Sequence, residues 1–160
     1  MMLPVETVVA RIRERFGLEF ALGPQGTARL VLSEGLAIDF ESSGEAALFV
    51  YAVLGPEPPE DLRAEVFAAM LQAQLFGRET GSAQFGLDSS RGELLLHRYF
   101  DLRLHEADAV IEAIEDFSGV ALSWAAKLAE PQTITSSQTP PGEQNDAVRP
   151  VWQGGFGLKA

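Results

Sequence analysis

Two histidines are the side chains in this sequence best suited to acid–base or metal chemistry, and both lie near carboxylates. His97 stands in the apolar run LLLHRYF and His105 follows it, while Asp88 and Asp101 are close in the sequence. A His–Asp pair beside a serine could activate that serine as a nucleophile. The nearby serines belong to the turn DSSRG, however, and lack the Gly-x-Ser-x-Gly pattern of a nucleophile on a sharp turn. We therefore interpret His97 as a strand residue and His105 as a residue near a helix start.

Other reaction chemistries also lack their usual residue patterns. The histidines do not have the HExxH spacing of a zinc site, and there is no cysteine to supply a thiolate. The segment FGRETGS lacks the Gly-Lys-Ser/Thr ending of a phosphate loop, and the later GGFG does not join a strand to a helix. Seven acidic residues between Glu34 and Asp61 lack the spacing of a calcium loop. The sequence predicts a solvated acidic surface, with no metal, no cofactor and no enzymatic activity.

Length and charge limit the remaining classes of protein. A chain of 160 residues suits one domain with a core of its own. The 23 acidic and 12 basic residues give a formal net charge of −11, which disfavours binding to nucleic acid and anionic membranes. The N-terminus mixes charges with apolar residues, and the longest charge-free apolar run, Ala46 to Pro56, is too short for a membrane span. We expect a soluble cytoplasmic protein without a signal peptide.

The apolar pattern predicts three helices and five strands in the order α-βββ-α-ββ-α. Apolar residues recur at helical spacing or alternate at strand spacing, with Gly- and Pro-containing turns between the segments. The predicted helices span residues 4–16, 59–76 (or 60–76) and 106–128, and the predicted strands span 27–33, 35–42, 46–55, 83–87 and 93–100. Tight turns between successive strands require antiparallel pairing. We therefore expect an α+β fold with a twisted antiparallel sheet, in a domain over residues 1–129.

The chain changes character after Glu130. Pro, Thr, Ser, Gln and Gly dominate residues 130–160, a composition typical of disordered segments. The last residues, VWQGGFGL, hold the apolar cluster of this tail. We expect a disordered tail whose terminal apolar segment docks on its own or a partner subunit, recruits another protein, or is idle.

The order of elements resembles the class I type III secretion chaperones, also called the CesT-like or Tir-chaperone family. The matching segments are ALFVYAVLG (47–55), FAAMLQAQLFGRETG (67–81), FGLDSSRGELLLHRYFDL (85–102) and AIEDFSGVALSWAAKL (113–128), within a resemblance that covers about residues 4–128. Two features depart from the family pattern. Gln74 stands where the family often has asparagine, and the tail after Glu130 is longer than usual.

The resemblance implies a small acidic homodimer in the bacterial cytoplasm, without enzymatic activity or cofactor. Such a chaperone binds the N-terminal segment of a type III secreted effector, keeps it extended and secretion-competent, and delivers it to the secretion apparatus. The secretion ATPase that releases the cargo is a separate partner. The residues agree, because strands rich in Val, Leu, Phe and Tyr leave edges and apolar faces that an extended peptide can cover.

A two-fold dimer is expected to form through the second helix and the hairpin that follows it. Apolar residues occupy more than one face of this helix, so in a monomer one apolar face would be exposed to water. The predicted dimer interface consists of Val66, Phe67, Met70, Leu71, Gln74, Phe85 and Leu87.

Cargo is expected along the first helix and one face of the sheet. Phe49 and Tyr51 have the opposite strand parity to Leu48 and Val50, so one of the two sets must point away from the core. We assign the first set to the cargo surface. The predicted effector-binding residues are Val5, Val9, Ile12, Val31, Phe49, Tyr51 and Val53.

Two other functions are compatible with the same residues. A YbjN-like regulatory or sensory domain would share the order of elements and the acidic, non-enzymatic character, and co-purification with an effector separates it from a chaperone. A hydrolase that uses His97 or His105 would lose activity when that histidine is replaced by alanine.

Overall fold

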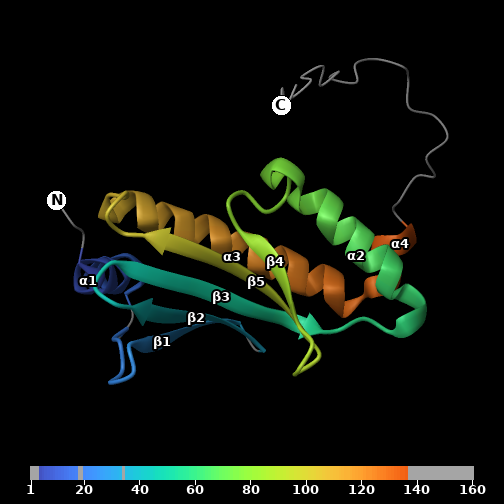
Figure 1. Cartoon of the computed structure of the whole chain (residues 1–160), viewed down its shortest axis with the longest axis horizontal. Helices are drawn as coiled ribbons and strands as arrows, with labels where there is room; N and C mark the ends of the chain where they lie inside the picture. The colour runs from blue at the N-terminus through green and yellow to red at the C-terminus, as the bar shows by residue number, and fades with distance from the viewer. Residues whose placement is uncertain (1–3, 18–19, 34, 137–160) are drawn as a thin grey trace, which may run out of the picture.

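The computed structural model of the chain describes residues 4–17, 20–33 and 35–136 (Figure 1). Its helices are α1 (Val5–Phe16), α2 (Glu60–Gln74), α3 (Ala107–Ala129) and α4 (Pro131–Ser136), and a short 3-10 turn, η1 (Leu75–Gly77), follows α2. Its strands are β1 (Thr27–Ser33), β2 (Leu36–Ser43), β3 (Ala47–Pro56), β4 (Gln84–Asp88) and β5 (Glu93–Asp101). The predicted order α-βββ-α-ββ-α is confirmed, with α4 added at its end.

The five strands form one antiparallel sheet in the order β1-β2-β3-β5-β4. Tight turns join β1 to β2 and β2 to β3, whereas β5 reaches β3 only after the chain has passed through α2 and β4. The central β3–β5 pair runs from Ala47 opposite Asp101 to Pro56 opposite Glu93. The strands twist against one another along this pair, as antiparallel strands of L-residues do (Figure 1).

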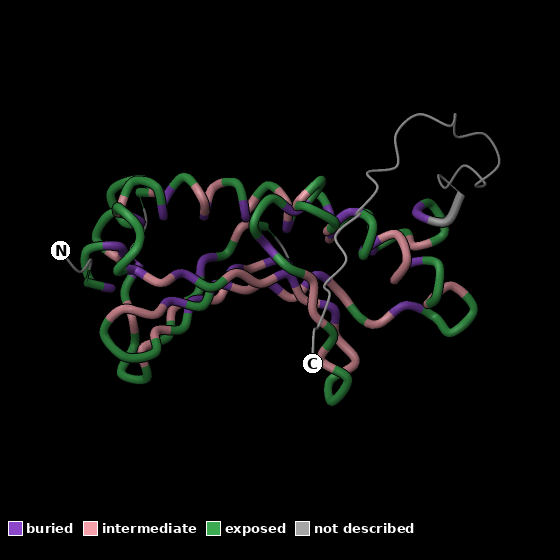
Figure 2. Tube along the Cα trace, turned by 45° about the horizontal axis from the view of Figure 1, so that its top comes forward, coloured by how far each residue is buried: buried purple, intermediate pink, exposed green. Residues whose placement is uncertain are grey.

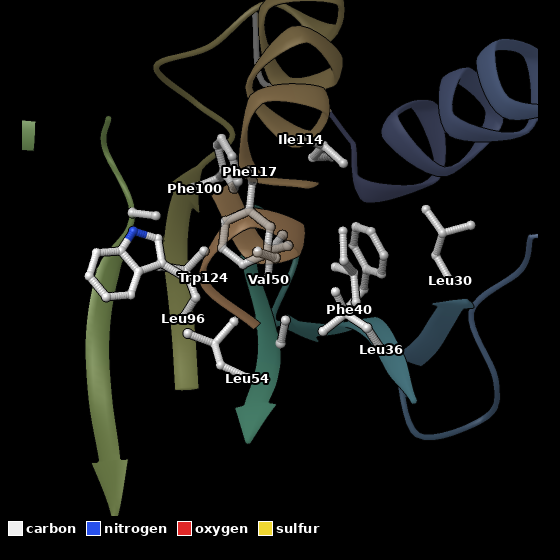
Figure 3. Close-up of a cluster of buried hydrophobic side chains, with 14 of the residues drawn as sticks. Leu30, Leu36, Phe40, Val50, Leu54, Leu96, Phe100, Ile114, Phe117 and Trp124 are labelled. Atoms are coloured by element: carbon white, nitrogen blue, oxygen red, sulfur yellow. The ribbon is translucent and has the colours of Figure 1, made fainter. Parts of the chain in front are cut away.

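Helices α1 and α3 lie over one face of the sheet, called the inner face below (Figure 2). Every second residue of β3 points to this face and is buried, namely Leu48, Val50, Ala52 and Leu54. Larger side chains from β2, β5 and α3 fill the layer between sheet and helices, among them Phe40, Phe100, Ile114, Phe117 and Trp124 (Figure 3). The core of the chain therefore lies on one side of the sheet.

Helix α4 extends the folded chain beyond the predicted boundary at residue 129. It packs against α2 and α3, and its Ile134 is only 7% exposed. The prediction of a disordered tail that starts at residue 130 is therefore wrong for residues 131–136. One isoleucine among polar residues leaves little signal in the sequence, yet its burial covers apolar surface of α2 and α3. Residues 137–160, with the predicted terminal apolar segment, lie outside the described residues.

Candidate functional site

No described helix lies over the sheet face opposite α1 and α3, called the outer face below (Figure 2). This face carries apolar side chains that are exposed to water. On this face Val31 of β1 lies opposite Ala37 of β2, and Val53 of β3 lies opposite Leu95 of β5. Val31 is 68% exposed and Phe49, on the same face, is 43% exposed, which are large fractions for apolar residues. The outer face is thus an apolar surface in contact with water.

The predicted sheet residues of the cargo surface lie together on the outer face. Alternation along β3 directs Phe49, Tyr51 and Val53 away from the core, and the pairing of β1 with β2 places Val31 on the same side. Whether this face binds an effector stays a prediction. A long-range pairing adds Tyr99, which sequence reasoning missed: it lies opposite Phe49, with ring centroids 5.0 Å apart, and is 50% exposed.

A polar row crosses the middle of the outer face. Arg29 donates two hydrogen bonds to Asp39 on the neighbouring strand, from Nε to Oδ1 at 2.6 Å and from Nη2 to Oδ2 at 2.9 Å. Tyr51 lies opposite Asp39, and His97 lies opposite Tyr51. Burial of the phenol, followed by the carboxylates of Asp39 and Glu41, raises the pKa of Tyr51 above its usual value. The outer face therefore combines apolar side chains with polar groups in fixed positions.

A hollow in the outer face lies between β1, β2 and β3. Its lining includes the apolar side chains of Val31, Leu36, Ala37 and Val53 and the charged groups of Arg29, Asp39 and Glu93. Such a hollow can accept a large apolar side chain whose neighbour carries a positive charge.

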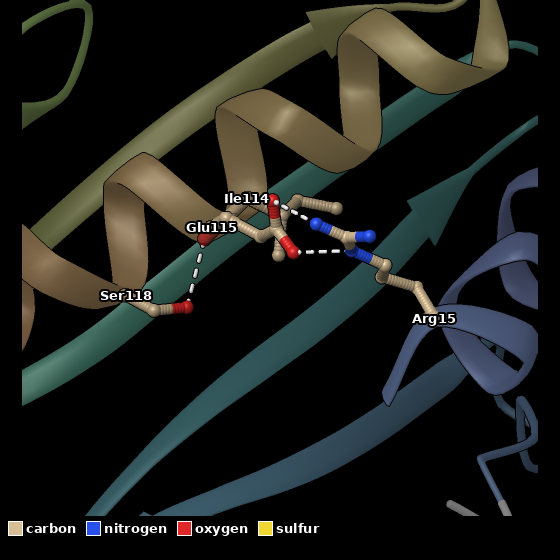
Figure 4. A network of polar contacts seen from close by, with 4 residues as sticks. All are labelled: Arg15, Ile114, Glu115 and Ser118. Carbon is tan, nitrogen blue, oxygen red and sulfur yellow. Dashed lines mark hydrogen bonds and ion pairs between the residues drawn. The ribbon is translucent and has the colours of Figure 1, made fainter. Parts of the chain in front are cut away.

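Helix α1 contributes less surface than predicted. Val5 and Ile12 are 4% and 0% exposed, so they belong to the core, and only Val9 of the predicted α1 set is half-buried. Arg15 fastens the helix to α3, because its Nε donates to Glu115 Oε1 at 2.6 Å (Figure 4). This hydrogen bond lowers the pKa of Glu115. The prediction that Val5 and Ile12 line the cargo surface is corrected here: their side chains hold α1 on the sheet.

The residues predicted at the dimer interface do not share one environment. Val66 and Met70 are 0% and 4% exposed and belong to the core on the side where α2 packs against α4 and β4. The other predicted interface residues reach the surface: Leu71 and Leu87 are exposed, and Phe67, Gln74 and Phe85 are half-buried. Val66 and Met70 are therefore corrected to core residues of the single chain.

Gln74, where the chain departs from the family pattern, holds the end of α2 to the sheet edge. Its side-chain Oε1 accepts a hydrogen bond from the backbone N–H of Phe85 at 2.5 Å. The Phe85 ring in turn packs edge-on against Trp124, with centroids 4.9 Å apart. An edge strand leaves backbone donors unpaired, and Gln74 satisfies one of them on β4.

Two further apolar residues at the end of α2 were not among the predicted interface residues. Leu75 is 46% exposed and Phe76 is 93% exposed, next to Leu71 at 68%. Phe76 also has a φ of 55°, a left-handed conformation that bulky residues rarely adopt. Leu71, Leu75 and Phe76 are called the α2 surface below. The sequence feature that could have predicted this exposure is the apolar pair directly before Gly77. The helix ends there, so these side chains have less of their own sheet to pack against.

The histidines are not assembled into a reactive group. His97 lies on the outer face between Tyr51 and Gln84, and His105 is exposed, with its ring edge-on to Phe100 at a centroid distance of 6.0 Å. Within residues 4–17, 20–33 and 35–136, no hydrogen bond joins either histidine to a serine or carboxylate, and no His/Asp/Glu cluster suited to a metal ion occurs. None of the helices in that part of the chain is long and apolar enough to span a membrane. The geometry offers surfaces for binding.

A small α+β fold with an uncovered apolar sheet face is typical of proteins that use this face to contact another molecule. Comparison with protein families identifies the family: the model of the Tir chaperone protein (CesT) family matches residues 7–125, and the chain belongs to this family. The resemblance seen in the sequence is thereby confirmed. A Chlamydia pneumoniae protein, CPj0713/CpB0740, is 27% identical over 107 residues, which cover 67% of this chain and 81% of the relative.

The same fold recurs in two solved complexes. A chain of the HopA1–SchA chaperone–effector complex matches with a TM-score of 0.59 at 12% identity, covering 76% of this chain and 93% of that chain. A chain of the ExoU–SpcU complex from the type III secretion system of Pseudomonas aeruginosa matches with a TM-score of 0.60 at 22% identity, covering 79% and 98%. These matches confirm the predicted secretion-chaperone fold of the subunit.

The alternative prediction, a YbjN-like domain, has weaker support. YbjN from E. coli matches with a TM-score of 0.52 at 13% identity, covering 79% of this chain and 96% of YbjN. The fold is therefore common to both groups of proteins. The family match favours the chaperone group, because the Tir chaperone family model matches residues 7–125 of this chain.

Proposed function

We propose that this protein is a chaperone of the bacterial cytoplasm that binds the N-terminal segment of a type III secreted effector. It keeps the segment extended and secretion-competent and delivers it to the secretion apparatus. The observation that carries the proposal is the outer face, where Val31, Phe49 and Tyr99 are exposed in a chain of the Tir chaperone family. The proposed activity is binding alone, without catalysis or cofactor, and the secretion ATPase is a second proposed partner.

An extended segment suits the outer face for physical reasons. Every second residue of an extended peptide points the same way, so its apolar side chains can cover Phe49, Tyr51 and Val53 in succession. Each apolar Å² removed from water contributes about 25 cal/mol, and a long segment covers enough area to offset the entropy lost when it is ordered. The net charge of −11 keeps the empty protein soluble despite its exposed apolar side chains.

We further propose that a second copy of the chain covers the α2 surface, which would make the protein a homodimer. Apolar side chains at the end of α2 are exposed to water, namely those of Leu71, Leu75 and Phe76. Leu87 of β4, which is also exposed, belongs to the same predicted interface. A two-fold axis places one patch against its own copy, so an apolar patch is complementary to itself. This arrangement gives α2 the second partner that its two apolar sides require.

A surface variant tests the cargo site. Phe49→Asp combined with Tyr51→Asp places two carboxylates on the outer face, so we expect the variant to lose the effector that the wild-type chain captures from the source bacterium. Its circular dichroism and molar mass should stay unchanged. Leu122→Asp is the matched control, because Leu122 is 44% exposed on α3, whereas Phe49 is 43% exposed on the outer face.

The captured protein decides between the candidate functions. A chaperone captures a protein that the type III apparatus exports, and the N-terminal segment of that protein binds by itself. Unchanged capture by the double variant would contradict the outer face as the cargo site. Capture of a regulatory protein that is not exported, by the wild-type chain, would instead favour the YbjN-like function.

A further inference from the structure

The apolar outer face and the apolar C-terminal segment belong to the same chain. We propose that residues 151–158, with the sequence VWQGGFGL, dock on the outer face of their own chain and fill the hollow lined by Val31, Ala37 and Val53. The segment thereby covers the cargo surface while no cargo is bound. Its role as a regulator of cargo binding rests on the proposed function, whereas the docking itself does not.

The composition of the segment matches the hollow. Trp152, Phe156 and Leu158 supply large apolar side chains, and an aromatic side chain buries about 150–250 Å². Glycine occupies residues 154, 155 and 157. Because glycine has no Cβ, the backbone between the aromatic residues can approach a sheet closely. Val31, at 68% exposed, is the apolar side chain of the hollow with most to gain from this cover.

Charge complementarity supports the same pairing. Arg149 and Lys159 flank the segment, and residues 149–160 contain no acidic side chain. Glu93 borders the hollow, and within the described residues it has no ion-pair partner, whereas Asp39 is neutralised by Arg29. A basic residue next to the docked segment would pair with Glu93, so an acidic protein offers this basic apolar segment a favourable surface.

The chain is long enough to make this contact. The described residues end at Ser136 in α4, and residues 137–150 connect it to the segment. Those residues can span up to about 46–50 Å when extended, at 3.3–3.6 Å for each residue. The ten residues of β3 cover about 33 Å. The connecting residues can therefore span a distance greater than the length of β3, and tethering raises the effective concentration of the segment to about the millimolar range.

Docking of this kind would regulate cargo binding. An empty chaperone with an exposed apolar face risks association with other proteins, and a weakly bound internal segment lowers that risk. Cargo must then displace the segment. Only a peptide that makes more contacts with the outer face than residues 151–158 make can therefore bind there. The outer face would thus select for long apolar segments.

Paramagnetic relaxation in the full-length chain tests the docking. The sequence has no cysteine, so Ala160→Cys carries a single spin label beside the segment. We expect the label to broaden the amide resonances of Val31, Ala37 and Val53 and to leave those near Leu122 on α3 sharp. An excess of a synthetic peptide of residues 149–160 should restore the broadened signals by competition.

Paired variants make the test specific. Trp152→Ser with Phe156→Ser should abolish the broadening, and Val148→Ser, a change in the same tail outside the segment, should preserve it. Val31→Asp in the hollow should also abolish it, whereas Leu122→Asp should not. Uniform broadening, or broadening confined to the α2 surface, would overturn the proposal.

Mixed samples separate docking within one chain from docking between chains. Isotope-labelled chains without cysteine are combined with spin-labelled chains without isotope. Sharp signals in this mixture confirm docking on the same chain, and broadening overturns that assignment. The measurement uses no effector, so its failure is distinct from a failure of the proposed chaperone function.

Discussion

The two faces of strand β3 are both apolar, yet they meet different surroundings. Leu48 and Val50 on the inner face are 2% and 0% exposed, whereas Phe49, between them in the sequence, is 43% exposed. The inner residues belong to the core under α1 and α3 (Figure 3), whereas Phe49 is partly exposed to water. Burial on folding stabilises the inner set. The outer set is only partly buried, so part of its apolar area is still available to a partner.

The same contrast recurs on α2. Met70 and Leu71 are neighbours in the sequence, but Met70 is 4% exposed and Leu71 is 68% exposed. Neighbouring apolar residues on this protein can therefore face the core or water, and the direction in which each side chain leaves the backbone decides which. Substitutions at neighbouring positions can separate the two roles.

The largest expected effect comes from a cavity on the inner face. Leu48→Ala should lower the free energy of unfolding by about 2–5 kcal/mol, because it removes buried methyl groups and leaves a void. Phe49→Ala, its neighbour, should change stability by less than about 1 kcal/mol. Urea denaturation of both variants measures the difference. Equal losses of stability would show that the outer face also contributes to the core.

A change on the α2 surface should act on association and leave the fold intact. Leu71→Glu introduces one carboxylate twice across a two-fold interface, so we expect dimer affinity to fall about tenfold or more. Multi-angle light scattering over a range of concentrations measures this loss. The control is Leu122→Asp on α3. A Leu71→Glu variant that dimerises like the wild type would place the interface elsewhere.

A smaller effect is expected from the C-terminal segment. Trp152→Ser with Phe156→Ser removes an internal competitor, so the N-terminal segment of the captured effector should bind about two- to tenfold more tightly. Isothermal titration calorimetry of the full-length chain provides the measurement, with Val148→Ser as the control. Identical affinities for both variants would show that the segment does not compete with cargo.

The smallest effect concerns an ion pair at the end of the outer face. The hydrogen bond from Arg103 Nη2 to Asp101 Oδ2, 2.6 Å long, contributes most to lowering the pKa of Asp101 from 3.8 to about 2. Because the pKa is depressed in the folded state, this pair contributes stability above pH 4 and loses it as the pH falls toward 2. Asp101 is half-buried but its partner Arg103 is exposed to water, which screens the pair, so the contribution is small.

Carboxyl NMR titration checks this last expectation. The Asp101 signal should titrate near pH 2 in the wild type and near its usual pKa in Arg103→Gln. Asp101→Asn should remove the matching part of the acid dependence of stability. A normal titration of Asp101 in the wild type would show that the pair does not persist in solution.

Local patterns in the sequence determined most of the elements. Alternation in LFVYAVL predicted that Phe49, Tyr51 and Val53 share a face, because side chains along a strand alternate whatever surrounds them. The apolar stripe around Val8 and Ile12 likewise predicted α1, and the tight turns predicted antiparallel strands. The family resemblance rested on the order of these elements, which the family match supports.

Only the tertiary structure decided how the elements combine. The β3–β5 pair forms across α2 and β4, and it alone brings Tyr99 beside Phe49 on the outer face. In the sequence, a buried apolar residue cannot be distinguished from one on a binding surface. Tertiary packing placed four of the predicted surface residues in the core, namely Val5, Ile12, Val66 and Met70. The pattern of apolar residues in the sequence shows only how these residues are spaced along the chain. Which of them water still reaches depends on contacts between distant segments, such as Ile134 of α4 on α2, that no local window contains.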